Sequence, residues 1–109
     1  MLANLIVPVL NRYDLLNRMI KSIDYPINRL LLIDNGCQYE VDDWPGNEYV
    51  QNWYLMSMPS NLGVAASWNL GIKLLPHDHV WTFASNDMWY RPGDLERLSE
   101  ASRGSLTLS

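Results

Sequence analysis

Two short apolar runs constrain the fold of this chain more than any other feature. Leu5–Val9 and Leu30–Ile33 are apolar at every position, so neither run alternates between apolar and polar residues. A strand of this kind buries both of its faces, which is typical of parallel sheets that helices cover on each side. Two further strands are predicted at Tyr49–Met58 and Val80–Ala84, where aromatic and β-branched residues gather.

Segments with helical spacing separate these strands. Apolar residues recur at intervals of three and four residues in Asp14–Ile23 and Val64–Leu75. Pro92–Ser102 begins with proline and acidic residues, as the first turn of a helix favours. Residues 37–48 are polar and acidic and predict a loop. The alternation predicts an α/β fold, a three-layer Rossmann-like architecture with a mainly parallel sheet.

Composition favours one small folded domain. The chain has 109 residues, of which 48% are hydrophobic, enough for a core. We expect a single domain over residues 1–109, with a frayed tail at 103–109. The formal net charge is −4 and there is no run of Lys or Arg, which argues against nucleic acid or an anionic membrane surface as a partner.

The sequence also bears on the compartment. No apolar stretch approaches the roughly 20 residues of a membrane span. The first ten residues lack the basic region of a signal peptide, and the one cysteine, Cys37, excludes an intrachain disulfide. We therefore expect a cytoplasmic protein without a membrane span.

Five tryptophans are a high number for a chain of this length. Packing in the core or at an interface explains them better than a stacking surface for bases or sugars. Large aromatics on a small domain also favour association. We therefore expect a homo-oligomer, or a partner chain.

Polar side chains follow three of the predicted strands at the point where each strand ends. Asn11 follows the first strand, Asp34-Asn35 follows the second, and Ser85-Asn86-Asp87 follows the fourth. The carboxyl ends of parallel strands lie at one edge of a sheet, where such sheets bind their ligands. Asn61-Leu62-Gly63 adds a glycine-bearing turn that opens a helix. A loop-to-helix junction beside an acidic strand end can hold a diphosphate and its metal ion, which predicts nucleotide chemistry.

The same segments resemble the nucleotide-binding half of family 2 glycosyltransferases, which have the GT-A fold. The similarity runs from residue 3 to about residue 98, and Pro92–Leu95 resembles the segment that follows the family's acidic motif. The four segments that carry the resemblance are Ile6–Arg12, Leu32–Gly36, Asn61–Gly71 and Phe83–Asp87. The resemblance implies transfer of a sugar from a UDP-, GDP- or TDP-sugar to an unknown acceptor, with inversion.

The resemblance also implies roles for individual residues. Asp34 matches the aspartate that reads the base through a hydrogen bond. Asp87 matches the last acidic residue of the Asp-x-Asp motif, which holds Mn²⁺ or Mg²⁺ on the diphosphate of the donor. The other positions that the family implies for the nucleotide site are Pro8, Val9, Asn11, Asn35, Gly63, Asn69, Ser85 and Asn86.

Several features depart from the family pattern. Ser85 stands at the first acidic position of the metal motif, Trp68 stands where many members carry arginine, and Cys37 replaces the usual serine. Family members also use a second half, which binds the acceptor and supplies a catalytic base. The later carboxylates of this chain are typical of a solvated helix face, and we assign no base among them: Asp94, Glu96 and Glu100.

Structural roles stay open for the same residues. Asp34 could simply end a strand and start a turn, and Asp87 could cap the turn that follows it. His77-Asp78-His79 is more typical of a solvated turn than of a transition-metal site. Cys37 has no basic neighbour in sequence that would activate it as a nucleophile. Two other functions also remain open: a non-catalytic nucleotide-binding module, and an interaction protein with an inherited fold.

Overall fold

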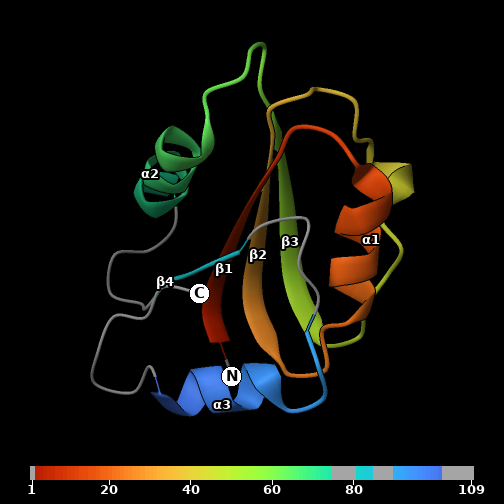
Figure 1. Ribbon diagram of the computed structural model, residues 1–109, viewed down its shortest axis with the longest axis vertical. Coiled ribbons are helices and arrows are strands. Elements are labelled where there is room, and N and C mark those ends of the chain that lie inside the picture. The colour runs from red at the N-terminus through yellow and green to blue at the C-terminus, as the bar shows by residue number, and fades with distance from the viewer. Residues whose placement is uncertain (1, 75–80, 85–89, 102–109) are drawn as a thin grey trace.

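A four-stranded parallel sheet with the strand order β3-β2-β1-β4 forms the centre of the protein (Figure 1). The computed structural model describes residues 2–74, 81–84 and 90–101. The strands are β1 (Leu2–Val9), β2 (Ile27–Asp34), β3 (Val50–Ser57) and β4 (Trp81–Phe83). The helices are α1 (Tyr13–Lys21), α2 (Val64–Leu74), α3 (Asp94–Ala101) and a short 3₁₀ helix, η1 (Val41–Asp43).

Helices cover both faces of the sheet, which confirms the predicted three-layer α/β fold with its GT-A-like, Rossmann-like parallel sheet (Figure 1). Successive residues of each strand point to opposite faces, so β1 and β2 supply a core on each side. The larger core joins the sheet to α1 and α3 and includes Leu5, Val7, Leu16, Met19, Ile20, Leu30, Leu32 and Leu95. The smaller core lies under α2 and contains Ile6, Leu31 and Ile33.

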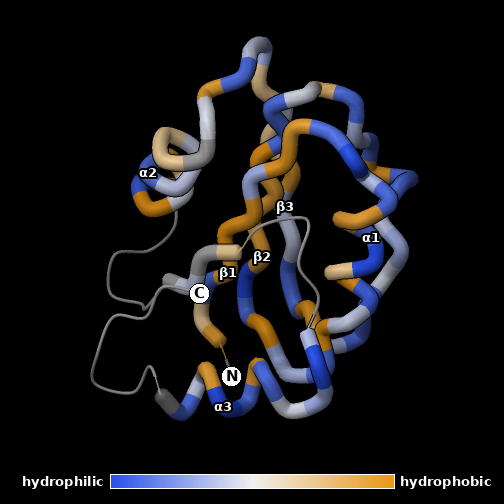
Figure 2. The backbone as a smooth tube through the Cα atoms, viewed as in Figure 1, coloured by the Kyte–Doolittle hydropathy of each residue, from blue (hydrophilic) through white to orange (hydrophobic). Residues whose placement is uncertain are grey.

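Hydropathy follows this layering along the chain. The hydrophobic stretches run along β1 and most of β2, and hydrophilic residues occupy much of the loops and the outer parts of the helices (Figure 2). Each fully buried Leu or Ile side chain contributes about 1.5–3 kcal/mol relative to an exposed one, so the two cores account for much of the driving force for folding. This is the physical reason why the two apolar runs predict the strands so well.

The tryptophans with described side chains have packing roles, as the sequence predicts. Trp44 and Trp53 stack with their ring centroids 4.4 Å apart and their planes at 7°, and both rings pack against the larger core. Trp68 packs from α2 against the smaller core.

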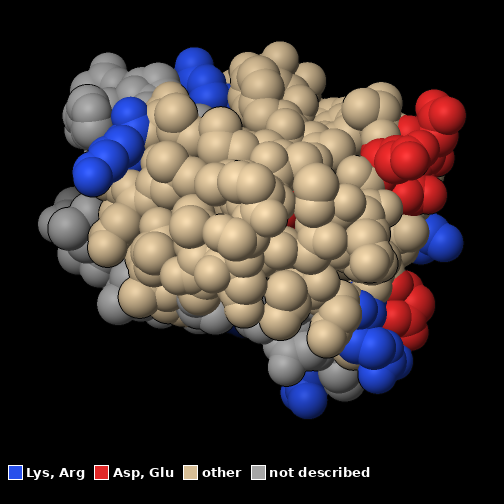
Figure 3. Space-filling model, turned by 90° about the horizontal axis from the view of Figure 1, so that it is seen from above, with Lys and Arg blue, Asp and Glu red and all other residues tan. Residues whose placement is uncertain are grey.

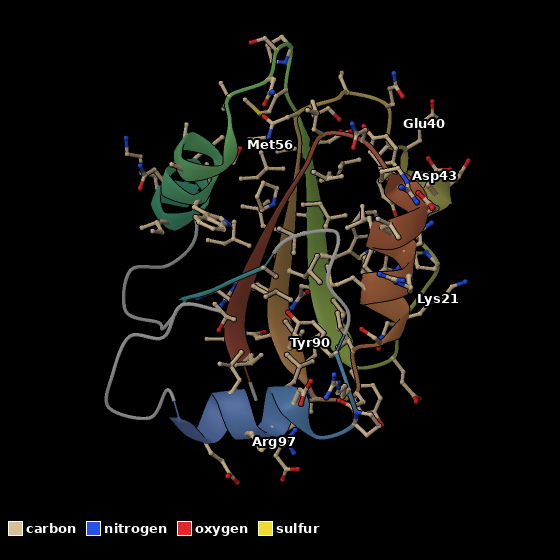
Figure 4. All side chains as sticks on the ribbon, in the orientation of Figure 1. Lys21, Glu40, Asp43, Met56, Tyr90 and Arg97 are labelled. Atoms are coloured by element: carbon tan, nitrogen blue, oxygen red, sulfur yellow. The ribbon has the colours of Figure 1, made fainter. Side chains whose placement is uncertain are left out.

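The segment before α3 is tied to the amino end of the sheet. The backbone N–H of Tyr90 donates to Ser22 Oγ at 2.8 Å, and that of Gly93 donates to Asp24 Oδ2 at 3.2 Å. Figure 4 shows Tyr90 over the sheet and Arg97 on α3, at the end opposite the carboxyl ends of β1–β3. The predicted tail at 103–109 and His77-Asp78-His79 lie outside the described residues.

Gly71 lets α2 approach β1 closely. A Cβ atom at this position would lie 2.7 Å from both Cδ1 and Cγ2 of Ile6, inside the normal contact distance. Glycine in a helix interior costs about 1 kcal/mol relative to alanine, so its presence here indicates that the close approach matters more than helix propensity.

We predict that Gly71→Ala destabilises the protein although alanine favours helices. Overpacking against Ile6 should lower the free energy of unfolding by about 1–3 kcal/mol, measured by urea denaturation. Asn69→Ala, an exposed substitution on the same helix, should change it by less than about 0.5 kcal/mol. Equal stability of Gly71→Ala and the wild type would contradict the close packing of α2 on β1.

Candidate functional site at the carboxyl edge of the sheet

The strand order creates a switch point between β1 and β4. The chain moves outward from β1 to β2 and β3, and β4 then pairs on the opposite side of β1. Open α/β sheets bind their ligands in the crevice at the carboxyl ends of the strands beside such a point. The residues that follow β1 and β2 therefore reach one edge, as the sequence predicts for Asn11 and Asp34. Ser85, Asn86 and Asp87 lie outside the described residues.

The Asp34 carboxylate is buried at the end of β2 and is surrounded by five donors. The side chain has no solvent exposure. The hydroxyl of Tyr13 donates to Oδ1 at 2.7 Å. The backbone N–H groups of Gly36–Tyr39 donate to the two carboxylate oxygens at distances of 3.1, 3.1, 2.9 and 2.7 Å. A carboxylate offers about four lone-pair sites, so these donors saturate it.

The local sequence explains how this loop closes around Asp34. Cys37 has a φ of 55°, a left-handed conformation that turns the backbone so that successive N–H groups converge. A Cβ atom at Gly36 would overlap the Leu10 carbonyl oxygen and the Tyr13 hydroxyl, so only glycine fits there. In this structure Asp34 therefore ends a strand and organises a turn, and its contact with a nucleotide base stays a prediction.

Tyr13 is the side chain that links α1 to this carboxylate. Burial raises the pKa of Tyr13 to about 12, and the hydrogen bond to Asp34 adds to the shift, so the hydroxyl keeps its proton at neutral pH. The ring stacks on Tyr39 with centroids 5.8 Å apart, and the Tyr39 hydroxyl donates to Asn17 Oδ1 at 2.9 Å. Sequence spacing missed Tyr13, because nothing in the spacing shows that its hydroxyl reaches across to β2.

We predict that Tyr13→Phe lowers stability and alters its dependence on alkaline pH. Losing a hydrogen bond to a charged group should cost about 1.5–3 kcal/mol at pH 7. Since the folded protein raises the pKa of Tyr13 from 10.0 to about 12, its contribution is complete below pH 10 and declines as the pH rises to 12. The variant should lack that part of the decline, measured by urea denaturation from pH 7 to 12. The control is Tyr54→Phe at an exposed tyrosine, whose free energy of unfolding should match the wild type at every pH. The same result for Tyr13→Phe would contradict the hydrogen bond between Tyr13 and Asp34.

Asn35 joins the end of β2 to the turn before α2. Its side chain is only 6% exposed, and Nδ2 donates to Ser67 Oγ at 2.9 Å while Oδ1 accepts the N–H of Leu62 at 3.0 Å. The Ser67 hydroxyl in turn donates to the Gly63 carbonyl at 2.7 Å. The polar atoms of Asn35 therefore position the turn, which places Gly63 beside the strand ends.

We predict that Asn35→Ala loosens α2 from the sheet. The substitution removes the acceptor of the Leu62 N–H and the Asn35 donor to the Ser67 hydroxyl, which should cost about 0.5–1.5 kcal/mol for each hydrogen bond. Hydrogen exchange should then speed up at the Leu62 and Ser67 amides more than in β1. The matched control, Asn52→Ala on the exposed part of β3, should leave the exchange of these amides unchanged. Unchanged exchange in Asn35→Ala would show that the hydrogen bonds of Asn35 do not hold the turn.

The turn before α2 has the conformation that its glycine allows. Gly63 has a φ of 82°, and its N–H donates to Asn61 Oδ1 at 2.9 Å. Asn61 therefore stabilises the turn itself. The Gly63 carbonyl accepts a hydrogen bond from the Ser67 N–H at 3.1 Å, the first hydrogen bond of the helix. The predicted link between this turn and a helix start is confirmed.

The remaining predicted site residues differ in their exposure. Pro8 and Val9 are buried within β1, whereas Asn11 is exposed just after it. Gly63 and Asn69 are exposed on the turn and on α2. No hydrogen bond found in the described part of the chain joins Asn69 to the strand ends. The structure thus gathers Asn11, Asp34, Asn35 and Gly63 at one edge, and Asn69 stands apart on its helix.

The surface over the strand ends carries few charges. Seen from above the carboxyl ends of β1–β3, most Lys, Arg, Asp and Glu side chains lie around the rim, and the middle is almost entirely tan, with one small red area (Figure 3). The sequence explains this, because Tyr49–Ile72 contains no charged residue. Glu40 and Asp43 lie beside α1 (Figure 4). Arg12 contacts Asp14 at 3.0 and 2.9 Å, and these contacts lower the pKa of Asp14 to about 2.

The described residues offer little for a metal ion on their own. They contain no group of three or more His, Cys, Asp or Glu side chains placed to hold one. The donors on Asp34 already occupy both of its oxygens.

The sheet order defines an α/β protein with polar residues at the carboxyl ends of β1 and β2. A family model described as glycosyl transferase family 2 matches residues 4–103, and the chain belongs to this family. No curated protein and no solved structure matches the chain. Within the described ranges, every helix is too short or too polar to cross a membrane.

Proposed function

We propose that this glycosyltransferase-like protein binds a nucleotide-sugar donor at the carboxyl edge, beside the switch point between β1 and β4. The observation that carries the proposal is the agreement between the family match over residues 4–103 and a sheet order that brings Asn11, Asp34 and Asn35 to that edge. The donor is a UDP-, GDP- or TDP-sugar, and the sugar passes to an acceptor with inversion of the anomeric centre.

In this proposal the base and ribose lie against the segments after β1 and β2. A base N–H that reaches Asp34 must replace one of its five donors. Four of these are backbone groups of one loop, so Tyr13 is the one that exchanges at least cost. Its hydroxyl already lies 3.3 Å from the Leu10 carbonyl oxygen, which can accept the hydrogen bond of Tyr13 when the base arrives.

The proposed diphosphate site is the segment that follows β4. Asp87 would hold Mn²⁺ or Mg²⁺, with Ser85 and Asn86 beside it and Gly63 on the neighbouring turn. A divalent ion prefers carboxylate and phosphate oxygens, and it would neutralise the charge on the departing diphosphate. With one carboxylate in the motif, we expect weaker metal affinity than two carboxylates would give.

The carboxylates of α3 are poorly placed to act as the catalytic base of this proposal. Asp94 accepts the N–H of Arg91 at 2.9 Å and a hydrogen bond from Arg97, which together lower its pKa. The helix lies at the end of the sheet opposite the carboxyl edge (Figure 1). The proton acceptor for the attacking hydroxyl therefore comes from elsewhere than α3.

We predict saturable, metal-dependent binding of one of the nucleotides UDP, GDP and TDP. Calorimetric titration in Mn²⁺ should give a dissociation constant that rises at least about tenfold in EDTA or in Asp87→Asn, the equivalent of about 1.4 kcal/mol. Asp24→Asn is the matched control, because Asp24 lies at the amino end of the sheet and an amide oxygen can still accept from Gly93.

The results separate the parts of the proposal. No saturable binding of any of the three nucleotides at millimolar concentration would overturn donor binding. Binding that ignores both EDTA and Asp87→Asn would overturn the metal site alone. Tyr13→Phe should tighten binding if the base exchanges with the Tyr13 hydroxyl, and unchanged affinity would overturn that exchange.

A second candidate function is a non-catalytic nucleotide-binding or interaction module. The saturated Asp34 carboxylate and the nearly uncharged middle of the carboxyl-edge face favour it. A non-catalytic module would not turn over a nucleotide-sugar. Hydrolysis or transfer of a nucleotide-sugar by the wild type, abolished in Asp87→Asn, would therefore exclude this second function.

A further inference from the structure

The edge strand β3 lacks the features that usually protect the edge of a sheet. In the described part of the chain β3 pairs with β2 alone, and Figure 1 shows it at the end of the sheet away from β4. Its eight residues include no charge and no proline. The pairing runs from Ile27–Val50 to Asp34–Ser57 with a constant offset, so no bulge interrupts it. Long, regular and uncharged edges readily pair with another strand.

The exposed side chains of β3 are uncharged on both faces of the sheet. Gln51, Asn52 and Ser57 are exposed, and Tyr54 keeps 47% of its surface accessible. Tyr54 pairs with Leu31, so it lies on the α2 side, but α2 packs on β1 and β2 and leaves it uncovered. Trp53 pairs with Leu30 and lies on the α1 side.

We propose that β3 pairs with β3 of a second copy of this chain, antiparallel about a two-fold axis that lies between the two copies of Tyr54. The two sheets would then form one continuous sheet. The residue beside a two-fold axis meets its own counterpart, so a charge at that position would meet a like charge. The chain has 20 charged residues, the sum of 8 Lys and Arg and 12 Asp and Glu, yet none lies on β3. An edge without charge, with an exposed aromatic ring near its centre, is self-complementary about such an axis, which points to a second copy as the occupant.

The alternation of side chains restricts the register. Residues directly opposite each other must have side chains on the same face of the sheet. One residue of β3 must therefore lie opposite its own counterpart, with the axis between the two copies. An axis at Tyr54 places this exposed ring against the partner's Tyr54 on the α2 side. It also places Trp53 opposite the partner's Leu55 on the α1 side. Aromatic pairs and aromatic–aliphatic pairs are the cross-strand contacts that stabilise sheets most.

The size of this contact sets its strength. An eight-residue strand is about 26 Å long, at roughly 3.3 Å per residue. A contact through one strand of this length is small beside the ~1,200 Å² at the low end of stable interfaces. We therefore expect a reversible dimer whose population depends on protein concentration.

Engineered cysteines test the register in a Cys37→Ser background. Opposite residues of an antiparallel pair have Cα atoms about 4.5–5.5 Å apart, which a disulfide can span. Tyr54→Cys should therefore give a covalent dimer on mild oxidation, seen on a non-reducing gel. Asn52→Cys is the matched control, because its counterpart would lie about 13 Å away along the strand, and it should stay monomeric.

A charge at the axis tests the interface itself. Sedimentation velocity should show the wild-type protein moving from monomer to dimer as its concentration rises. Tyr54→Lys should remain monomeric throughout, whereas Gln38→Lys, on an exposed loop, should dimerise like the wild type. A wild-type monomer at all concentrations, a dimer that Tyr54→Lys leaves intact, or equal cross-linking of the two cysteine variants would each overturn the proposal.

Discussion

The rest of the carboxyl edge depends on how the Asp34 carboxylate is satisfied. A buried carboxylate without partners costs several kcal/mol, so the chain must bring donors to it or the strand end cannot stay inside. Here the donors are the Gly36–Tyr39 backbone and the Tyr13 hydroxyl. The Asp34 carbonyl also accepts the N–H of Met58 at 2.9 Å. One residue therefore connects the loop after β2, the start of α1 and the end of β3.

This arrangement ties the stability of the edge to its availability for a ligand. An oxygen that holds a loop cannot also read a base unless a donor leaves, and the loop N–H groups leave only if the loop unfolds. The Tyr13 hydroxyl is different because rotation of one O–H bond redirects its proton toward the Leu10 carbonyl. A ligand could use the lone pair that this rotation frees only if the Tyr13 side chain also moved aside, because Asp34 has no solvent exposure.

The sequence predicts the layers and the sheet far better than it predicts these side-chain contacts. Apolar runs identify β1 and β2 because burial on both faces leaves a pattern that spacing can reveal. The first three residues of β2, Ile27–Arg29, are missed because two of them are polar. The start of α3 is placed at Pro92 and lies at Asp94, because Gly93 adopts a φ of 83°.

For the candidate site, too, the sequence predicts where strands end but not which contacts their side chains make. Strand ends can be read from sequence, so Asn11, Asp34 and Asn35 are brought to one edge as predicted. The direction in which a side chain donates depends on tertiary geometry, so neither the saturation of Asp34 nor the Asn35–Ser67 bond could be foreseen. The roles of Ser85, Asn86 and Asp87 rest on the family pattern, since these residues lie beyond the described segments.

The uncharged stretch Tyr49–Ile72 affects two surfaces at once. On β3 it removes the repulsion that would otherwise keep two copies apart. At the carboxyl-edge face it removes the lysines and arginines that could meet a diphosphate, while Arg12 is engaged with Asp14. A diphosphate bound at this face would therefore rely on a divalent ion for most of its charge compensation, because the neighbouring turn and the first part of α2, up to Ile72, supply only backbone dipoles.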